Sequence, residues 1–377
     1  MSAPHFDAII VGLGAMGSQA AAHLARRGAR VLGLDRFAPP HAWGSSHGRS
    51  RIIREAYFED PRYVPLVQRA LENWRALEAE TGVRLLRTTG GLCYGPPDGS
   101  LVRGARLSAQ AHDLPHELLD AAVLRARYPQ FRVEDDWVGV LEPRAGMLDP
   151  ERAIGTALRV AVAHGARLHL DTPVLRWRQE GDGVAVDTAM GTHRAAQLVL
   201  AGGMWMRELL PELALPLTVQ RNVVYWFTPA REDAAFAPER CPVFLGEIAP
   251  GRLWYGFPDT GDGFKVGLHH HGPVTEPHAL DRTVRPEEIA ALRALLGRWI
   301  PWANGPFREA AVCTYTTTPD EHFIIDRHPL ADRVWVASPC SGHGFKFASA
   351  IGEVLADLVT GGQSRFDLSP FAIGRYS

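Results

Sequence analysis

Short apolar runs separated by a helical pattern mark the first part of the chain. Residues 6–11 form one apolar run, a glycine-rich segment follows, and a helix-compatible stretch up to Gly28 precedes a second apolar run that ends at Asp35. This order predicts a strand, a tight turn, a helix and a second strand. From Pro61 to Gly82 the apolar positions follow helical spacing, so this stretch predicts one amphipathic helix with a proline in its first turn.

The middle of the chain changes from a helical pattern to short β-rich segments. Asp149 and Pro150 combine a cap residue with a proline suited to the first helical position, and they predict a helix that ends at Gly165. The apolar segments that follow, RLHL, VLRW, GVAVDT and QLVLAGG, predict a small sheet. Between residues 218 and 269, short β-rich segments are divided by Pro, Gly or Asp turns and predict an antiparallel sheet.

The last part of the chain predicts strands near 308–314, 322–326 and 333–338, then a glycine-rich turn and a helix closed by Gly361 and Gly362. Elements typical of nucleotide binding therefore stand at both ends, with an antiparallel insertion between them. We expect a mixed α/β (α+β) fold in which a Rossmann-like domain is interleaved with an antiparallel-sheet substrate domain. The expected bounds are 1–85, 150–215 and 310–377 for the Rossmann-like domain, and 86–149 and 216–309 for the substrate domain.

Composition narrows the class of protein. The 377 residues are 46% hydrophobic and 22% charged, which is typical of a folded protein with a large core. A net charge of −2 provides no positive field for a nucleic-acid backbone, so we expect no nucleic-acid partner. Four scattered cysteines are too few for a disulfide framework or a paired-cysteine zinc site, and they fit a reducing compartment. The chain shows no secretory pattern and no run of about 18 apolar residues, so we expect a cytoplasmic protein without a membrane span.

Gly12, Gly14 and Gly17 form the pattern G-x-G-x-x-G between the first predicted strand and helix. The first glycine makes the turn, the second lets a pyrophosphate approach the backbone, and the third allows the helix to pack on the strand. The helix N-terminus would offer N–H groups to the phosphates, and Asp35 would bind ribose hydroxyls. This pattern predicts dinucleotide binding, with a structural turn that binds no ligand as the alternative. It does not separate FAD from NAD.

A second glycine-rich turn, residues 341–346, also precedes a predicted helix and contains Gly342 and Gly344. Free N–H groups at such a terminus could stabilise negative charge on a flavin ring or a substrate anion. A simple helix start is the alternative.

Three arginines, Arg49, Arg51 and Arg54, lie in a segment interrupted by two isoleucines, which indicates partial burial. A buried arginine needs an anionic partner, and its guanidinium can bind a carboxylate through two hydrogen bonds. A structural ion pair with Glu55 or Glu59 explains the pattern equally well.

The segment FKVGLHHH has the alternation of a strand. Alternation would place Lys265, Gly267, His269 and His271 on one face and His270 on the other. Three consecutive histidines on a strand cannot all face one ion, and no second ligand cluster stands out, so we expect no metal site.

Cys313 lies in a β-type stretch without a second cysteine nearby, and on spacing alone it is a small core residue. Its surroundings belong to a wider resemblance. The segments GLGAMG, SSHGRSRIIR, WYGFP with FKVGLH, CTYTTTPDEHFIID and SGHGFKF, in this order along nearly the whole chain, resemble the family of monomeric sarcosine oxidase and N-methyl-amino-acid oxidases, including N-methyltryptophan and pipecolate oxidases. The resemblance implies FAD as the cofactor, bound covalently through Cys313.

The resemblance also implies roles for charged residues. Arg54 and Lys346 would hold the substrate carboxylate, because two cations offset the cost of burying an unpaired carboxylate. Arg51 and His47 would lie near the flavin. Lys265 would promote the reaction with O₂, because a fixed cation stabilises the negative charge that O₂ acquires.

Tyr255, His269 and Tyr315 match pocket residues that contact the amine or the flavin, and His269 is a candidate modulator of amine protonation. Two positions depart from many family members, since Ser46 replaces histidine and Arg49 replaces aspartate. The segment SSHGRSRIIREAY resembles pipecolate oxidase more closely than sarcosine oxidase, so the identity of the amino acid stays open.

We therefore expect an FAD-dependent oxidase of secondary α-amino acids, such as sarcosine or another N-methyl amino acid. The products would be an imine that hydrolyses to an aldehyde and a primary amino acid, together with H₂O₂. The alternatives are an oxidase of L-pipecolate or another cyclic imino acid, a dehydrogenase of the same fold, an NAD dehydrogenase, or a nucleotide-binding protein without turnover. The expected partners are a small secondary amino acid and O₂, and the resemblance implies a monomer.

Overall fold

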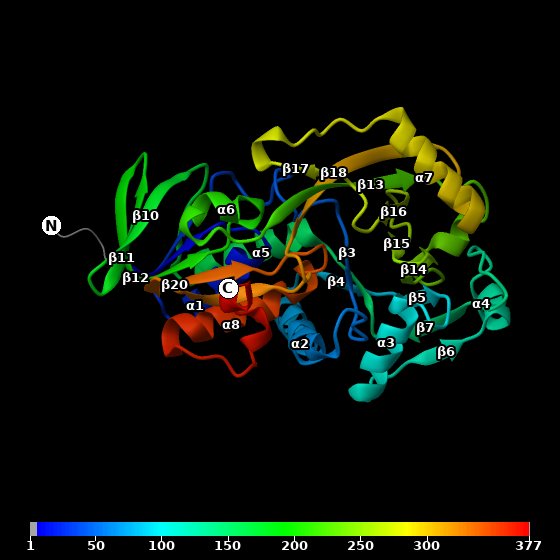
Figure 1. The fold of residues 1–377 in the computed structure, drawn as a ribbon, viewed down its shortest axis with the longest axis horizontal. Helices are drawn as coiled ribbons and strands as arrows, with labels where there is room; N and C mark the ends of the chain where they lie inside the picture. Colours follow the sequence, from blue (N-terminus) through cyan, green and yellow to red (C-terminus); the bar gives the residue numbers. More distant parts are fainter. Residues whose placement is uncertain (1–5, 377) are drawn as a thin grey trace.

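The computed structural model describes residues 6–376, which form two large β-sheets that occupy opposite halves of an elongated molecule (Figure 1). Helices cover the first sheet, and a small third sheet lies between the two large ones. Within the described residues, no helix combines the length and the hydropathy needed to cross a bilayer.

The first sheet has the parallel centre of a nucleotide-binding fold. β1 pairs in parallel with β2 and β12, β2 pairs in parallel with β9, and β12 pairs in parallel with β20. β10, β11 and β19 add antiparallel pairs at its edges. The strands are β1 (Phe6–Val11), β2 (Val31–Leu34), β9 (Arg167–His169), β10 (Val174–Glu180), β11 (Gly183–Thr188), β12 (Gly191–Leu200), β19 (Ile324–His328) and β20 (Ala331–Ser338).

Two helices, α1 (Ala15–Arg26) and α8 (Ala348–Gly361), pack on this sheet, and α2 (Val64–Thr81) and α5 (Pro150–Ala163) pack on those helices. α1 packs against α5 and α8, and α2 packs against α8. The approach of α8 to α1 is close, because a Cβ at Gly352 would lie 2.5 Å from the Cβ of Gln19. Local signals set the helix ends as predicted: Asp149 caps α5 with its side chain, while Gly82 and Gly362 end α2 and α8 in the left-handed conformation.

The second sheet has the order β17-β13-β16-β15-β14-β5-β7-β6, with β18 also paired to β13. Its pairs are antiparallel except for β5 with β14. The strands are β5 (Gly91–Gly95), β6 (Glu117–Leu119), β7 (Val138–Glu142), β13 (Thr218–Phe227), β14 (Val243–Ala249), β15 (Arg252–Phe257), β16 (Phe264–Leu268), β17 (Val274–Thr275) and β18 (Phe307–Thr317). The third sheet joins β3 (Arg51–Ile53), β8 (Gly146–Leu148) and β4 (Leu86–Thr88).

Shorter helices complete the fold. α3 packs against β5, β7 and β14, and α4 packs against β7. The remaining helices are α3 (Ser100–Ala111), α4 (Ala121–Arg127), α6 (Met206–Leu209), α7 (Pro286–Trp299) and the 3₁₀ helices η1 (Pro61–Tyr63), η2 (Gly203–Trp205), η3 (Pro211–Leu213), η4 (Asp233–Phe236), η5 (Pro277–Ala279), η6 (Pro301–Ala303), η7 (Phe345–Phe347), η8 (Ser369–Phe371) and η9 (Ile373–Tyr376).

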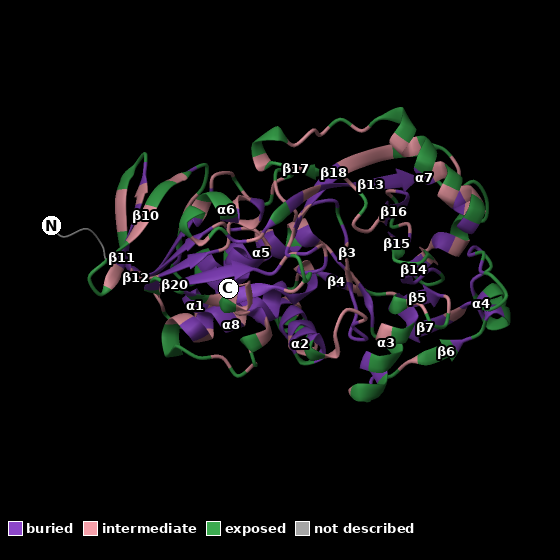
Figure 2. Cartoon of the chain, viewed as in Figure 1, coloured by how far each residue is buried: buried purple, intermediate pink, exposed green. Residues whose placement is uncertain are grey.

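Buried residues concentrate in the strands of the first sheet and in the helices packed on them, whereas parts of α3, α4 and α7 are exposed (Figure 2). A separate cluster of buried residues, rich in aromatic side chains, lies at the second sheet. Its members include Phe227, Phe244, Phe264 and Trp299. The first sheet contributes to two clusters of buried residues, and one of them extends to Cys93, Val140, Leu245 and Leu253 of the second sheet.

The strand predicted near 308–314 is confirmed as β18, which runs from 307 to 317. Two other predictions about strands were wrong. The segments after Gly165 form no small sheet of their own, because β9 joins β2 and β12 joins β1. Strand alternation also ends at Leu268, since His270 adopts a φ of 49°. The expected domain bounds stay a prediction, and the bound at residue 310 lies inside β18, which pairs with β13.

Candidate active site

A cavity of about 670 Å³ runs between the two halves of the molecule. At one end it reaches Val11 and Leu34, where the parallel strands β1 and β2 end. At the other end it reaches Lys346 and the second sheet, which contributes Tyr255 and Cys313. Ligands of open parallel sheets bind at the carboxyl ends of the strands, so the position of the cavity is typical of a binding site.

The first glycine-rich turn shapes one end of the cavity. Gly12 has a φ of 90°, and a Cβ there would lie 2.4 Å from the carbonyl oxygen of Ala201. Gly14 lines the cavity, and a Cβ there would have no atom within 4 Å. A Cβ at Gly17 would lie 1.8 Å from the oxygen of Gly12, so this glycine allows α1 to pack on the turn. The contacts of Gly12 and Gly17 fit the turn and helix-packing roles of the pattern, and the role of Gly14 toward a pyrophosphate stays a prediction.

Asp35 lies beside this turn and lines the cavity. One carboxylate oxygen accepts a hydrogen bond from the N–H of Leu13 at 2.7 Å, and the other accepts one from the N–H of Phe37 at 2.9 Å. Asp35 therefore fixes the backbone of the turn. Its predicted contact with ribose hydroxyls stays a prediction.

Cys313 of β18 lies next to a guanidinium. Nη2 of Arg51 is 3.5 Å from Sγ of Cys313, and the same nitrogen donates to the carbonyl of Ser45 at 2.7 Å. Nη1 donates to the carbonyl of Ser50 at 2.8 Å, so backbone oxygens hold the guanidinium in place. A neighbouring cation stabilises negative charge on sulfur and makes a cysteine more reactive.

Lys265 of β16 lies behind the cavity wall, 2% exposed. Its Nζ donates to the carbonyl of Gly48 at 2.6 Å, the carbonyl of Ser50 at 2.9 Å and the hydroxyl of Ser50 at 3.0 Å. Burial and then Arg51 lower the pKa of Lys265 well below its ordinary value. Three acceptors nevertheless match the three N–H donors of an ammonium, and the ring of Phe257 lies 4.5 Å from Nζ, so the contacts favour the charged form.

His47 also lies behind the wall. Burial and then Arg51 lower the pKa of His47 to about 4, so the ring is neutral near pH 7. Its Nε2 has no hydrogen-bond partner among the residues that the structure describes. Of the predicted site residues, only Gly17, His47 and Lys265 do not line the cavity directly.

Arg54 lies on the cavity wall with a side chain that is 5% exposed. Nη2 donates to Glu59 at 2.6 Å and Nη1 donates to the carbonyl of Ala56 at 2.9 Å, so the alternative of an ion pair with Glu59 is confirmed. Burial alone would lower the pKa of Arg54, but the Glu59 carboxylate outweighs it and raises the pKa. Arg54 is therefore charged, and Glu59 lines the same cavity.

Lys346 is the second buried cation at this end. Its Nζ donates to the carbonyl of His343 at 2.6 Å and lies 5.2 Å from the centre of the Tyr57 ring. Burial and then Arg54 lower the pKa of Lys346 to about 7, against an opposing effect of Glu59. Arg54, Lys346 and Glu59 together leave up to one uncompensated positive charge beside the cavity.

Glycines bring the second turn against the second sheet. Gly342 has a φ of 77°, and a Cβ there would lie 2.5 Å from the ring of Tyr315 and 3.0 Å from the ring of His269. A Cβ at Gly344 would lie 1.7 Å from the carbonyl oxygen of Pro339. The turn is thus tightly packed and is more than a simple helix start.

The aromatic side chains of Tyr255, His269 and Tyr315 also line the cavity. Nδ1 of His269 lies 3.2 Å from the hydroxyl of Tyr315, and the rings of Tyr255 and His269 meet edge to face. Burial and then His270 lower the pKa of His269 well below its ordinary value, so this ring is neutral near pH 7. His270 does not point away as alternation predicts, because it also packs edge to face on Tyr315.

Sequence reasoning missed the pair Tyr57 and His343. Nε2 of His343 lies 3.0 Å from the carbonyl oxygen of Glu321, which can only accept, so Nε2 carries the hydrogen. Nδ1 then accepts from the hydroxyl of Tyr57. Burial is the main cause that lowers the pKa of His343 to about 3. The position of His343 inside the second glycine-rich turn is the signal that could have found it.

Within residues 6–376, no group of three or more His, Cys, Asp or Glu side chains is placed to hold a metal ion.

Comparison with known proteins identifies the family. The model of the FAD dependent oxidoreductase family matches residues 7–358. Monomeric sarcosine oxidase of Streptomyces avermitilis is 45% identical over 372 residues, which cover 98% of this chain and 97% of that protein. N-methyl-L-tryptophan oxidase of Citrobacter koseri is 37% identical over 379 residues, which cover 99% of each chain.

Solved structures agree in fold. NikD, an unusual amino acid oxidase essential for nikkomycin biosynthesis, aligns with a TM-score of 0.86 at 25% identity over 98% of both chains. Glycine oxidase from Geobacillus kaustophilus aligns with a TM-score of 0.82 at 20% identity over 98% of this chain and 99% of that one. The chain therefore belongs to the FAD dependent oxidoreductase family, in the group that contains monomeric sarcosine oxidase and N-methyl-L-tryptophan oxidase.

Proposed function

We propose that this FAD-dependent oxidoreductase is an oxidase of small secondary α-amino acids, with sarcosine or another N-methyl amino acid as substrate. One observation carries the proposal: two buried cations, Arg54 and Lys346, line the same cavity as the dinucleotide-type turn. The names of the sarcosine and N-methyl-L-tryptophan oxidases to which the chain is similar support the same substrate class.

The residues of the cavity fit FAD. α1 begins at the first glycine-rich turn without a side-chain cap, so its first N–H groups are available to phosphates. The missing Cβ of Gly14 leaves open space for a close approach to the backbone. We propose Cys313 as the covalent attachment point, because its sulfur lines the cavity and contacts Arg51. When bound, FAD would accept a hydride equivalent from the substrate and pass two electrons to O₂, which yields H₂O₂.

The substrate carboxylate is assigned to Arg54 and Lys346. An anion in a buried pocket loses its hydration and needs compensating charge. Glu59 neutralises part of the cationic charge, so the site suits one carboxylate rather than two. A secondary amino acid with an uncharged side chain meets this condition.

The amine end is assigned to Tyr255, His269 and Tyr315. The amine must be unprotonated before its C–H bond can lose a hydride equivalent, because an ammonium group has no lone pair to support the developing imine. A neutral His269 adds no positive charge that would repel the incoming ammonium. Both tyrosines line the same cavity as His269.

Lys265 is assigned to the reaction with O₂. Its ammonium is fixed by three oxygen acceptors and lies close to Arg51 and Cys313, as their electrostatic effects on its pKa indicate. A fixed cation of this kind favours the oxidase over a dehydrogenase that uses another electron acceptor.

We propose that the enzyme works as a monomer, which the name of the similar monomeric sarcosine oxidase supports. Within residues 6–376 the four cysteines are unpaired, which supports a cytoplasmic location.

Anaerobic titration tests the proposal. The purified yellow protein is mixed with sarcosine, N-methyl-L-tryptophan, L-pipecolate and L-proline, and loss of flavin absorbance is recorded before air is admitted. We expect loss of absorbance with an N-methyl amino acid and peroxide formation in air. Absorbance that persists with every amine would refute the proposal. Loss without peroxide in air would identify a dehydrogenase, and a response to L-pipecolate alone would assign a cyclic substrate.

A further inference from the structure

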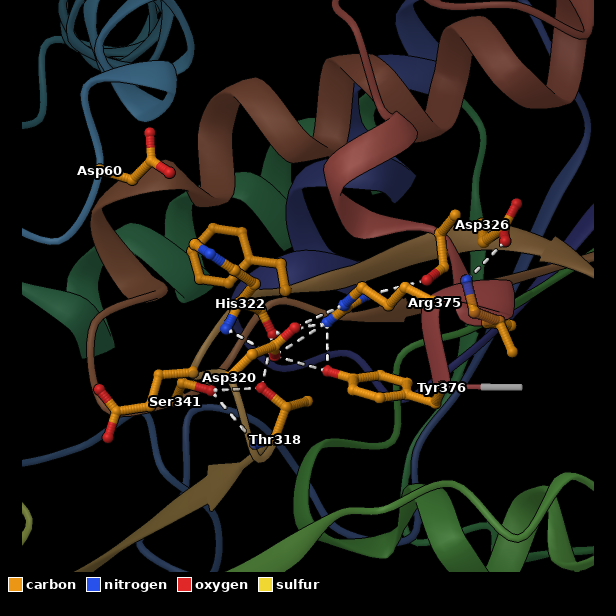
Figure 3. Close-up of polar contacts among 12 residues, drawn as sticks. Asp60, Thr318, Asp320, His322, Asp326, Ser341, Arg375 and Tyr376 are labelled. Atoms are coloured by element: carbon orange, nitrogen blue, oxygen red, sulfur yellow. Dashed lines mark hydrogen bonds and ion pairs between the residues drawn. The ribbon is translucent and has the colours of Figure 1, made fainter.

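The last described residues fold back onto the loop between β18 and β19. Nε of Arg375 donates to one carboxylate oxygen of Asp320 at 2.8 Å, and the hydroxyl of Tyr376 donates to the other at 2.6 Å (Figure 3). Nη2 of Arg375 also donates to the carbonyl of His322 at 3.1 Å. Burial alone would raise the pKa of Asp320, but hydrogen bonds from Arg375 and Tyr376 outweigh it and lower the pKa. Asp320 is therefore an ionised anchor for the C-terminal segment.

The loop held in this way touches the second glycine-rich turn at two points. The hydroxyl of Thr318 lies 3.3 Å from the hydroxyl of Ser341 and donates to the carbonyl of His322 at 2.7 Å. The carbonyl of Glu321 accepts from Nε2 of His343 at 3.0 Å. The loop thus binds both Ser341 and His343, and Figure 3 shows the Thr318–Ser341 contact beside the Arg375 contacts.

The second turn needs such support. Ser341 is a non-glycine residue with a φ of 51°, a conformation that costs energy unless neighbouring contacts enforce it. The carbonyl of His343 accepts from Nζ of Lys346 at 2.6 Å. A continuous series of contacts therefore joins Arg375 to Lys346.

Aromatic packing attaches the C-terminal segment to the same place. Phe371 of η8 packs on the rings of Tyr63 and Phe323, at centroid distances of 5.3 Å and 5.6 Å. The ring of Phe323 stacks on His343 at 4.9 Å. The hydroxyl of Tyr63 lies 3.0 Å from Nδ1 of His322. Loop, turn and C-terminal segment share one aromatic cluster.

We propose that Arg375 and Tyr376 are positioning residues: by binding Asp320 they hold the loop 318–322 and, through it, the turn 341–346 that places Lys346 in the substrate site. The part of this inference that concerns substrate rests on the proposed function. The side chains of Arg375 and Asp320 are 17% and 35% exposed and lie at the edge of the fold, so we expect the main effect of removing the pair in the loop and turn that it contacts.

Hydrogen exchange of the holoenzyme tests the inference directly. Arg375→Ala and Tyr376→Phe are compared with the unmodified protein, and exchange is followed in peptides that cover 318–322 and 339–346. Arg125→Ala is the control for loss of an arginine ion pair elsewhere in the chain, because Arg125 also binds one carboxylate, Asp135 at 2.6 Å, and one carbonyl, Val133 at 2.8 Å, in a more exposed setting. We expect exchange in both peptides to accelerate by about two- to tenfold in the two variants and not in the control.

Kinetics then separate positioning from a structural role. We expect KM for the N-methyl amino acid to rise about two- to tenfold in Arg375→Ala, with kcat within about twofold and the melting temperature close to that of the control. Arg375→Lys, which can still reach Asp320, is expected to recover part of the change. Tyr376→Phe keeps the test valid if Arg375→Ala does not fold.

The outcomes are distinct. Unchanged exchange in 339–346 overturns the inference, and so does an unchanged KM in an active enzyme whose turn exchanges faster. Faster exchange in a protein that oxidises no secondary amine supports the link from Arg375 to the turn and shows that the proposed function has failed on its own.

Discussion

Arg51 holds its guanidinium against the sulfur of Cys313, with Nη2 3.5 Å from Sγ. The guanidinium cannot rotate away without giving up its hydrogen bonds to the carbonyls of Ser45 and Ser50. Cysteine reacts as the thiolate, and a fixed cation stabilises that form. The contact with Arg51, together with its place on the cavity wall, distinguishes Cys313 from Cys93 and Cys241, which belong to the hydrophobic cores.

We predict that Cys313→Ser abolishes covalent attachment of flavin. After acid precipitation, the unmodified protein should give a yellow pellet and the variant a yellow supernatant. Cys340→Ser is the control, because Cys340 lines the same cavity and should not affect the pellet. Arg51→Gln should lower the covalently bound fraction. A yellow pellet from Cys313→Ser would refute this assignment.

Gly14→Ala should impair FAD binding and affect the fold less than a change at Gly17. Gly14 has a φ of −68° and a ψ of −149°, so alanine there would carry some backbone strain, but its Cβ would meet no atom within 4 Å. The added methyl would occupy space next to the helix N-terminus, so we expect flavin content to fall by about tenfold or more. The measurement is flavin absorbance per protein after purification.

Gly17→Ala is the contrasting variant. Its Cβ would lie 1.8 Å from the oxygen of Gly12, so it should destabilise the fold by about 1–3 kcal/mol or more. Thermal unfolding is compared in Cys313→Ser proteins from which FAD has been removed, because bound FAD adds stability of its own. A melting temperature of Gly14→Ala as low as that of Gly17→Ala would contradict the distinction.

Local signals in the sequence were enough to predict many helix and strand ends. Asp149 caps α5 and Gly82 ends α2, because caps and left-handed glycines act within a few residues. Partners distant in sequence could not be predicted. β12 pairs with β1, and no local pattern encodes a partnership across so much of the chain.

In the candidate site, too, partners that are distant in sequence could not be predicted. The sequence left the partner of Arg54 open between Glu55 and Glu59, and the structure selects Glu59. Glu55 instead lies 3.1 Å from Arg144, which comes from a distant part of the chain. His270 was placed on the wrong side because a positive φ is not visible in a run of three histidines. The roles of the individual site residues stay predictions that the variants described here test.

Arg54→Ala should weaken substrate binding strongly. The change removes one cation from the substrate carboxylate and leaves Glu59 buried without its 2.6 Å ion pair. Orphaning a buried charge usually costs about 2–5 kcal/mol, so KM should rise by about thirtyfold or more. Steady-state kinetics with the best N-methyl amino acid provide the measurement.

The control for Arg54→Ala is Arg49→Ala. Arg49 belongs to the same segment but pairs with Glu309 and Asp262 at the surface. Its loss should change KM by no more than about twofold, because exposed ion pairs contribute little. Equal effects of the two variants would argue against a carboxylate clamp at Arg54.

Binding of a carboxylate should weaken as pH rises through about 7. Burial lowers the pKa of Lys346 to about 7, and Lys346 binds an anion only when it is protonated. Below this pH the cation is fully present, and above it the affinity should fall by up to about tenfold per pH unit. Acetate is the probe, because it has no amine to titrate, and its binding is followed through the flavin spectrum.

Two variants isolate the contribution of Lys346. Lys346→Arg keeps its charge over the whole range, so acetate binding should lose most of its dependence on pH. Lys346→Met should bind acetate weakly at every pH. A pH dependence that persists unchanged in Lys346→Met would assign the titration to another group.

Lys265→Met should slow the reaction with O₂ far more than the reaction with substrate. The oxygens of Gly48 and Ser50 fix Nζ of Lys265. The methionine variant therefore loses a positive charge that is held at one place. A unit charge at about 4 Å in an effective dielectric near 20 is worth about 4 kcal/mol, or roughly a thousandfold in rate. Rapid mixing separates the two steps as loss of flavin absorbance with substrate and its recovery with O₂.

The sign of the pH effect adds a second test of Lys265. Burial and then Arg51 lower the pKa of Lys265 well below its ordinary value, and the protonated form is the one that stabilises negative charge on O₂. The rate of absorbance recovery should therefore be highest at low pH and fall as pH rises through the lowered pKa. Lys265→Arg should retain much of the rate and lose this dependence, because arginine stays charged. If Lys265→Met slows both steps equally, the side chain supports the fold of the loop 48–50 rather than the reaction with O₂.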